Sequence, residues 1–253
     1  MKHCKKLAIM ALTMMPAIVW AQKSIESNIE ADVVSRYVWR GQDRGGFSVQ
    51  PEASVSWQGL SLSAWGNIGL DKDDAREIDL TLGYERWGFN VGITDYWETG
   101  VDEQDRWLHF EKKGAHQLEA NLGYTCKYGS LQAYTIFWGN DFKIDGKQAY
   151  STYIELSVPF RLGSVDWIAK AGITPMESAG YTTPKTIATI WGEATVQVPH
   201  HYYAEGFACN VTSLRATKAV TIGSLELPLY GELCYNPYMN TAYMFFGATI
   251  RPF

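Results

Sequence analysis

The sequence predicts an all-β fold, a transmembrane antiparallel up-and-down β-barrel of about 12 strands. Three observations support this prediction: an N-terminal export signal, segments in which apolar and polar residues alternate, and connections that alternate between short and long. Together they are typical of a bacterial outer-membrane protein with short periplasmic turns and longer external loops.

Residues 1–21 have the composition of a secretory signal peptide. Lysines near the start precede an apolar run from Leu7 to Trp20, and small residues surround a cleavage site after Ala21. The apolar run is shorter than the roughly 20 residues that a membrane-spanning helix needs, which favours export over an anchor. We therefore expect the cell outer membrane as the location, and one barrel domain over residues 22–253.

The alternation is clearest from Leu60 to Leu70, where one face is apolar and the other mostly polar. In the similar segments that follow, a helix would place Glu119, Glu155 or Glu226 among leucines, so these segments are predicted to be strands. The predicted strands lie near 28–40, 47–57, 59–70, 76–86, 88–97, 116–126, 130–138, 149–161, 164–174, 206–220, 224–235 and 241–253.

Short turns that contain glycine alternate with longer polar loops along the chain, as in outer-membrane barrels. A soluble barrel or sandwich with its apolar face inward has the same two-residue period. A soluble closed barrel of this many strands, however, would leave an interior too wide for side chains to fill, which favours the membrane barrel. The short turns are at 57–59, 86–88, 127–130, 161–164 and 222–224, and the long loops are at 41–47, 71–75, 96–115, 139–148, 174–205 and 236–240.

Composition and residue spacing exclude several kinds of function. A net charge of −5 makes nucleic acid an unexpected partner. Three cysteines remain after export, so no complete disulfide framework is predicted, although two of Cys126, Cys209 and Cys234 can still pair. Their spacing indicates no metal site or cofactor, and the few histidines follow no catalytic spacing, so no catalytic residue is predicted and the chain is not expected to be an enzyme.

If the apolar faces contact lipid, the opposite faces line the lumen and carry charges of both signs. Opposed charges can set a transverse field that selects small polar solutes, or they can pair into a plug that fills a narrow barrel. Both interpretations are open from the sequence. The predicted lumen-lining residues are Asp32, Arg36, Arg40, Glu52, Asp79, Glu119, Glu155, Asp166, Lys170, Glu226 and Glu232.

The longest connection, residues 174–205, carries apolar residues and is therefore predicted to be ordered. We expect it to fold into the lumen as a constriction or to pack over the rim and contact a partner, because long ordered loops tend to be functional.

The segment from Ser35 to Gly41, which reads SRYVWRG, resembles the opening of a family of bacterial outer-membrane porins, the TorF type. The resemblance implies an outer-membrane barrel and a pore, and it carries over no catalytic residue.

The first functional hypothesis is a small channel that passes small polar or ionic solutes by diffusion. The second is a barrel with a closed lumen that acts through its external loops as a surface or assembly partner. The third, less favoured, is an enzyme that modifies envelope lipid through one of the loop histidines. Outer-membrane lipid and the barrel-assembly machinery are the expected partners, and the oligomeric state is not predicted.

Overall fold

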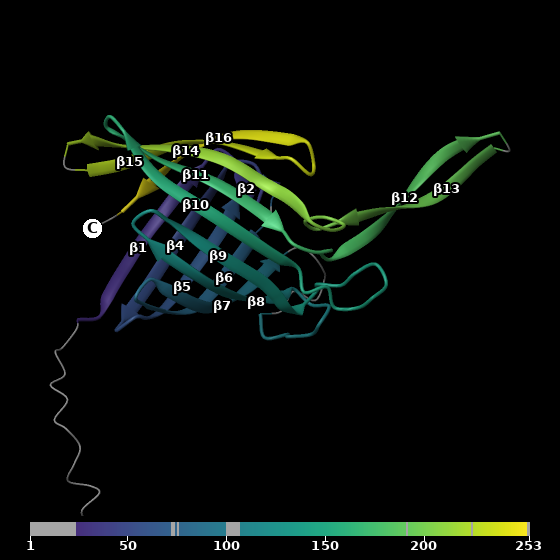
Figure 1. The fold of residues 1–253 in the computed structure, drawn as a ribbon, viewed down its shortest axis with the longest axis horizontal. Helices are drawn as coiled ribbons and strands as arrows, with labels where there is room; N and C mark the ends of the chain where they lie inside the picture. Colours follow the sequence, from purple (N-terminus) through teal and green to yellow (C-terminus); the bar gives the residue numbers. More distant parts are fainter. Residues whose placement is uncertain are drawn as a thin grey trace, which may run out of the picture.

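The computed structural model describes residues 24–71, 74, 76–99, 107–190, 192–223 and 225–251. The predicted signal peptide lies outside these residues. Within them the strands form a closed antiparallel barrel and two separate hairpins (Figure 1). No helix in these ranges is long and apolar enough to cross a membrane.

Twelve strands of the described chain form the barrel, which confirms the predicted fold class. Each pairs antiparallel with its neighbours, and β1 closes the barrel by pairing with both β16 and β4. The barrel strands are β1 (Glu26–Val34), β4 (Ser48–Trp57), β5 (Leu60–Gly69), β6 (Arg76–Arg86), β7 (Phe89–Thr99), β8 (His116–Cys126), β9 (Gly129–Gly139), β10 (Thr152–Leu162), β11 (Val165–Thr174), β14 (Ala208–Ile222), β15 (Leu225–Asn236) and β16 (Thr241–Ile250).

The apolar residues of the barrel strands face outward. Leu62, Leu82 and Ile93 are neighbours across β5, β6 and β7, and 48–54% of each residue is exposed. On the inner face of the next row, the hydroxyl groups of Thr81 and Thr94 lie 2.9 Å apart and form a hydrogen bond. The barrel therefore has an apolar outer surface and a polar interior, the reverse of a water-soluble barrel.

The short turns close strand pairs at one end of the barrel. Gln58 and Gly59, between β4 and β5, have φ angles of 53° and 90°, and consecutive positive φ values are typical of type I′ hairpin turns. A Cβ atom at Gly59 would lie 2.3 Å from the carbonyl oxygen of Glu85, so a larger residue does not fit there. The next hairpin repeats the arrangement at Trp87 and Gly88.

A small hairpin interrupts the first predicted strand, residues 28–40. In the structure β1 ends at Val34, and the chain then forms β2 (Tyr37–Trp39) and β3 (Gln42–Gly45), which pair with each other. This hairpin is not part of the barrel wall, and its side chains contact inward-facing residues of the wall.

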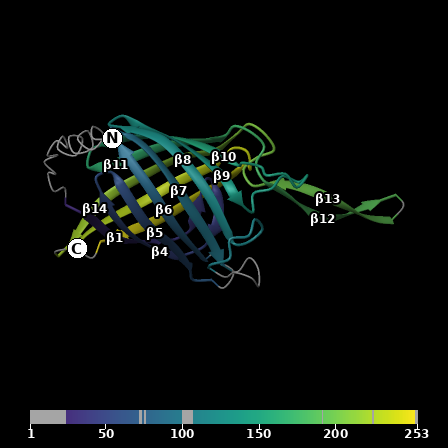
Figure 2. The ribbon, with the colours of Figure 1, turned by 90° about the horizontal axis from the view of Figure 1, so that it is seen from below.

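The connection from 174 to 205 forms a second hairpin, β12 (Gly180–Thr189) and β13 (Gly192–His201). Its order confirms the prediction, but the ribbon extends away from the barrel, as Figures 1 and 2 show from two directions. The expectation that it folds into the lumen or over the rim is therefore wrong for the ribbon. Each strand pairs along one edge with the other strand, and their outer edges are free.

Candidate functional site in the barrel lumen

The chain leaves the wall after β1 at a point held by β16. The Ser35 amide donates a hydrogen bond to the Phe246 carbonyl oxygen, and the Phe246 amide donates one to the Ser35 hydroxyl, both at 2.9 Å. Arg40 and Gly41 then form the turn between β2 and β3 with φ angles of 48° and 76°. A Cβ atom at Gly41 would lie 2.3 Å from the Asn210 carbonyl oxygen, so glycine allows the hairpin to approach β14 this closely.

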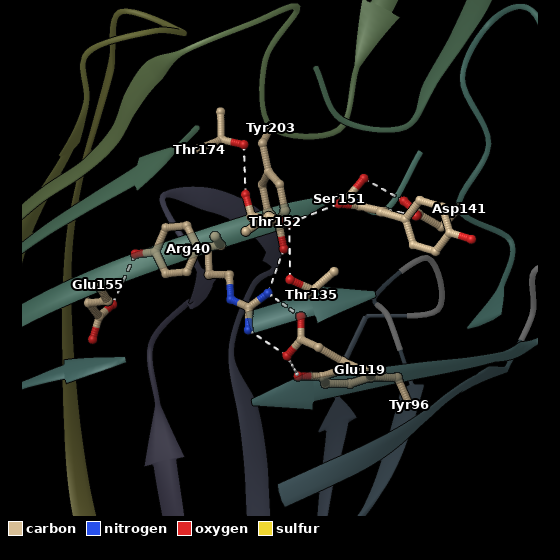
Figure 3. Close-up of polar contacts among 12 residues, drawn as sticks. Arg40, Tyr96, Glu119, Thr135, Asp141, Ser151, Thr152, Glu155, Thr174 and Tyr203 are labelled. Carbon is tan, nitrogen blue, oxygen red and sulfur yellow. Dashed lines mark hydrogen bonds and ion pairs between the residues drawn. The ribbon is translucent and has the colours of Figure 1, made fainter. Parts of the chain in front are cut away.

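Arg40, at the tip of this hairpin, forms a bidentate ion pair with Glu119 on β8 (Figure 3). Its Nη1 and Nη2 atoms donate to the Glu119 Oε2 and Oε1 atoms at 2.6 and 2.7 Å. The side chains are 7% and 1% exposed, so both charges are removed from bulk water. Bidentate pairs of this kind combine strong hydrogen bonds with a fixed geometry.

Aromatic rings enclose the ion pair. The rings of Trp39, Tyr134 and Tyr153 have their centroids 4.3, 4.4 and 4.9 Å from the Arg40 Cζ atom, within the range of cation–π contacts. The Tyr96 hydroxyl donates a hydrogen bond of 2.8 Å to Glu119. The hairpin tip, the wall and these rings therefore meet inside the barrel and obstruct the lumen at this level.

The base of the projecting hairpin also reaches the ion pair. Arg40 Nη1 donates a hydrogen bond of 2.6 Å to the hydroxyl oxygen of Tyr203, which follows β13 and is buried. Burial raises the pKa of the Tyr203 phenol above its ordinary value, so it remains a neutral acceptor for Arg40. The Gln42 side chain also donates to the Tyr202 carbonyl oxygen. The β2–β3 hairpin and the base of the projecting hairpin are thus joined inside the barrel.

Two further contacts hold the β2–β3 hairpin to the wall. The Tyr37 hydroxyl donates a 3.0 Å hydrogen bond to Glu77 on β6, and Arg44 forms an ion pair with Glu98 on β7. Together with Arg40, these contacts fasten the hairpin to three successive wall strands through their carboxylates. We use the term plug for residues 35–46 and their contacts with the wall.

The free space in the lumen is unevenly distributed. A cavity of about 750 Å³ lies at the short-turn end, where the inward-facing residues Glu26, Ser61 and Glu85 contribute to its lining. Beside the plug, a cavity of about 70 Å³ is lined by Arg40 and by residues of β10, β11, β14 and β15. At the long-loop end, a cavity of about 90 Å³ is lined in part by Arg44 and Tyr202. The two small cavities thus border the plug, whereas the larger one lies at the rim, where the outward-facing Trp57 and Trp87 also line it.

Arg36 and Arg40 are not wall residues, in contrast to the sequence prediction. Because β1 ends at Val34, both lie in the plug, where Arg36 forms an ion pair with Asp43 and Arg40 meets Glu119. Glu119 lies on the inward face of β8, beside the hairpin tip.

Other predicted lumen residues lie on the inward face but in separate groups. Lys170 is 3.9 Å from Glu155, and Glu232 forms a 2.6 Å ion pair with Arg215. Asp32 accepts a 3.2 Å hydrogen bond from Tyr230.

The remaining predicted residues occupy two levels of the wall. Glu52 and Asp79 are half-buried on β4 and β6. Asp166 and Glu226 are exposed near the short turns, and Asp166 lies 3.4 Å from Arg161.

Several residues of the site were not predicted from the sequence: Tyr37, Arg44, Glu77, Glu98, Tyr203 and Arg215. Glu77 shares the two-residue period of Asp79, so the alternation of strand 76–86 was a usable signal. Arg215 lies in a strand whose two faces both mix apolar and polar residues, and Tyr203 lies in a loop. The position of Arg215 is shown only by the pairing of β14 with its neighbours, and that of Tyr203 only by its contact with Arg40.

One histidine is buried, on the outer face of the barrel. The His116 Nδ1 atom lies 2.9 Å from the carboxylate of the outward-facing Asp95, and its Nε2 atom lies 2.7 Å from the Trp107 carbonyl oxygen. The Phe110 ring stacks on it at 4.0 Å. The 107–115 segment thus covers a polar pair on an otherwise apolar surface.

Neither metal ligation nor disulfide bonding is found in the described parts of the chain. Within them, no group of three or more histidine, cysteine, aspartate and glutamate side chains is placed to hold a metal ion. Cys126, Cys209 and Cys234 are free thiols.

Compared with known proteins, the chain matches no family model and has no significant similarity to a curated sequence. The resemblance of residues 35–41 to the TorF-type porins is therefore untested and stays a prediction.

Proposed function

We propose that the protein is an outer-membrane channel for small polar or ionic solutes, and that the plug closes it in the conformation described above. The observation that carries this proposal is the buried ion pair between Arg40 and Glu119. It holds the β2–β3 hairpin, which is not part of the barrel wall, inside a polar lumen. A buried ion pair is often no more stabilising than well-packed apolar side chains. An ionic contact is therefore more typical of a movable plug than of side chains that fill the lumen permanently.

The outer surface supports a location in a membrane. Large apolar side chains are exposed over the outer face, and an extended apolar surface of this kind marks contact with lipid or protein. Exposed aromatic residues lie at the strand ends beside the short turns, including Trp57, Trp87 and Phe89. Aromatic rings at this position are typical of the membrane–water boundary.

One observation favours the second candidate function, a closed barrel that acts through its external loops. The β12–β13 ribbon projects beyond the barrel, and apolar side chains such as Ile187 and Val196 are exposed on it. A ribbon of two strands with unpaired edges is available for contact with another protein. The channel and the closed barrel differ in whether the plug leaves the lumen.

Replacing residues 37–45 with a flexible glycine–serine linker of equal length is expected to produce a large and steady conductance in planar bilayers. The intact mature chain is expected to show smaller and intermittent openings, because its plug remains fastened to the wall. Single-channel recording measures both, and electrophoresis of unheated against heated samples verifies that each barrel is folded.

A matched variant carries the same linker chemistry in place of residues 182–199, in the projecting ribbon. It is expected to conduct like the intact chain, since the ribbon lies outside the lumen. If the folded variant without the plug hairpin is silent, the channel proposal is wrong and the closed-barrel function takes its place.

A further inference from the structure

The positive charges of the lumen are already neutralised. Among the described residues, each lysine or arginine side chain that faces the lumen lies within 4 Å of a carboxylate. Three of these pairs include a plug residue, and the others are on the wall. The pairs are Arg36–Asp43, Arg40–Glu119, Arg44–Glu98, Arg161–Asp166, Lys170–Glu155, Arg215–Glu232 and Arg251–Glu30.

Several carboxylates remain on the same inner surface after this pairing. Asp32 and Glu52 lie on the adjacent strands β1 and β4, where the wall register brings acidic residues side by side, as in the pair Glu30 and Glu52. Neither Asp32 nor Glu52 forms an ion pair with a cation among the described residues, and Asp32 has only the neutral Tyr230 hydroxyl as a donor. This side of the lumen therefore carries negative charge that the protein does not balance.

The inward-facing side of the cavity at the short-turn end also carries negative charge. Glu26 on β1 and Glu85 on β6 line it together with serine side chains. Arg86 also lines it, but its guanidinium stacks over the Trp87 ring at 4.3 Å, at the rim of the barrel. A solute that enters from this end therefore first passes the carboxylates of Glu26 and Glu85.

We propose that the channel is selective for small cations. This inference rests on the proposed channel function and names the class of solute that the lumen admits. An uncompensated carboxylate attracts cations and repels anions over about 8 Å at physiological ionic strength. Rings of acidic side chains select cations in other pores by the same effect. Because every lumen cation in the described residues is paired, the surplus acidic groups determine the sign of the field.

The permeability ratio of K⁺ to Cl⁻ tests this inference, measured as the reversal potential across a planar bilayer with a KCl gradient. We expect a ratio of about 5 or more for the mature chain, since one charge at contact distance raises the local cation concentration by about this factor even in water. The double substitution Asp32→Asn and Glu52→Gln is expected to lower the ratio at least about twofold on the same electrostatic grounds. Both changes keep the size of the side chain and leave one oxygen that accepts hydrogen bonds.

The substitution Glu193→Gln is the matched control, because Glu193 is exposed on the ribbon outside the lumen. It is expected to leave the ratio unchanged. The variant in which a glycine–serine linker replaces residues 37–45 provides a second recording, in which the plug hairpin is absent.

The outcomes separate the two proposals. Openings with a ratio near or below one, or a ratio that the Asp32 and Glu52 changes do not lower, overturn cation selectivity and leave the channel function intact. Folded protein that never conducts, even in the variant without the plug hairpin, overturns both.

Discussion

Replacing Arg40 with alanine is expected to destabilise the closed conformation by about 3–5 kcal/mol, the usual cost of removing one partner from a buried ion pair. Glu119 is 1% exposed and would lose the cation that balances it. The neighbouring aromatic rings and the Tyr96 hydroxyl cannot neutralise a carboxylate. The plug is therefore expected to leave the wall, so that water reaches Glu119.

Two measurements detect this result. Single-channel recording is expected to show longer openings for Arg40→Ala than for the intact chain, and hydrogen exchange is expected to show faster exchange at the β2 and β3 amides. The double change Arg40→Gln with Glu119→Gln is expected to cost much less closed-state stability than Arg40→Ala, because it leaves no unpaired charge.

The ion pair between Lys147 and Asp145 is a suitable comparison because it is equally direct, at 2.7 Å, but mostly exposed. Exposed pairs contribute little to stability, so Lys147→Ala is expected to change neither conductance nor exchange. If Arg40→Ala and the intact chain have the same conductance and the same amide exchange in β2 and β3, the ion pair does not hold the plug.

Replacing Leu82 with arginine is expected to lower the free energy of unfolding in lipid vesicles by about 2–4 kcal/mol, the cost of an arginine on the lipid face near the bilayer midplane. Leu82 lies in the middle of β6, between outward-facing residues of β5 and β7. If this face contacts hydrocarbon, the guanidinium loses its hydration there. Urea titration of the vesicle-bound barrel measures the change.

The control for this experiment introduces the same residue on the inner face. Ser61 faces the cavity at the short-turn end, so Ser61→Arg is expected to alter stability far less than Leu82→Arg. Equal effects of the two changes would mean that the outward leucines are not in lipid.

Much of the barrel follows from local sequence because its strands repeat every two residues. The segment from Leu60 to Gly69 places leucines on one side and serines on the other, and this pattern determines which residues share a face. The glycine turns then limit where each strand can end. The facing direction follows from the pattern together with the number of strands, because a soluble barrel of this size would not be filled by side chains.

The hairpin of the plug was not predicted, because nothing in its local sequence separates residues 35–40 from the first strand. Residues 35–40 continue the extended, alternating pattern of β1, so the strand was expected to reach residue 40. The chain turns inward because of contacts with residues far along the sequence, above all Glu119, which lies 79 positions after Arg40. Such partners become visible only once the barrel has closed.

The projecting ribbon was missed for a different reason. Pro184 and Pro199 interrupt its two strands, and prolines inside a segment normally argue against a strand. In the structure they lie in a two-stranded ribbon, where each strand has a free edge that needs no amide donor. The alternation on either side of Gly192 was nevertheless a usable signal for a hairpin.

Spin labels placed one at a time at residues 60–63 of the reconstituted mature chain, in a background without its three cysteines, test most directly whether the apolar face contacts lipid. Labels at Leu60 and Leu62 are expected to be accessible to oxygen dissolved in the bilayer, and labels at Ser61 and Ser63 to a water-soluble nickel complex. The opposite alternation, or equal access of the nickel complex at all four positions, would contradict a membrane-embedded barrel.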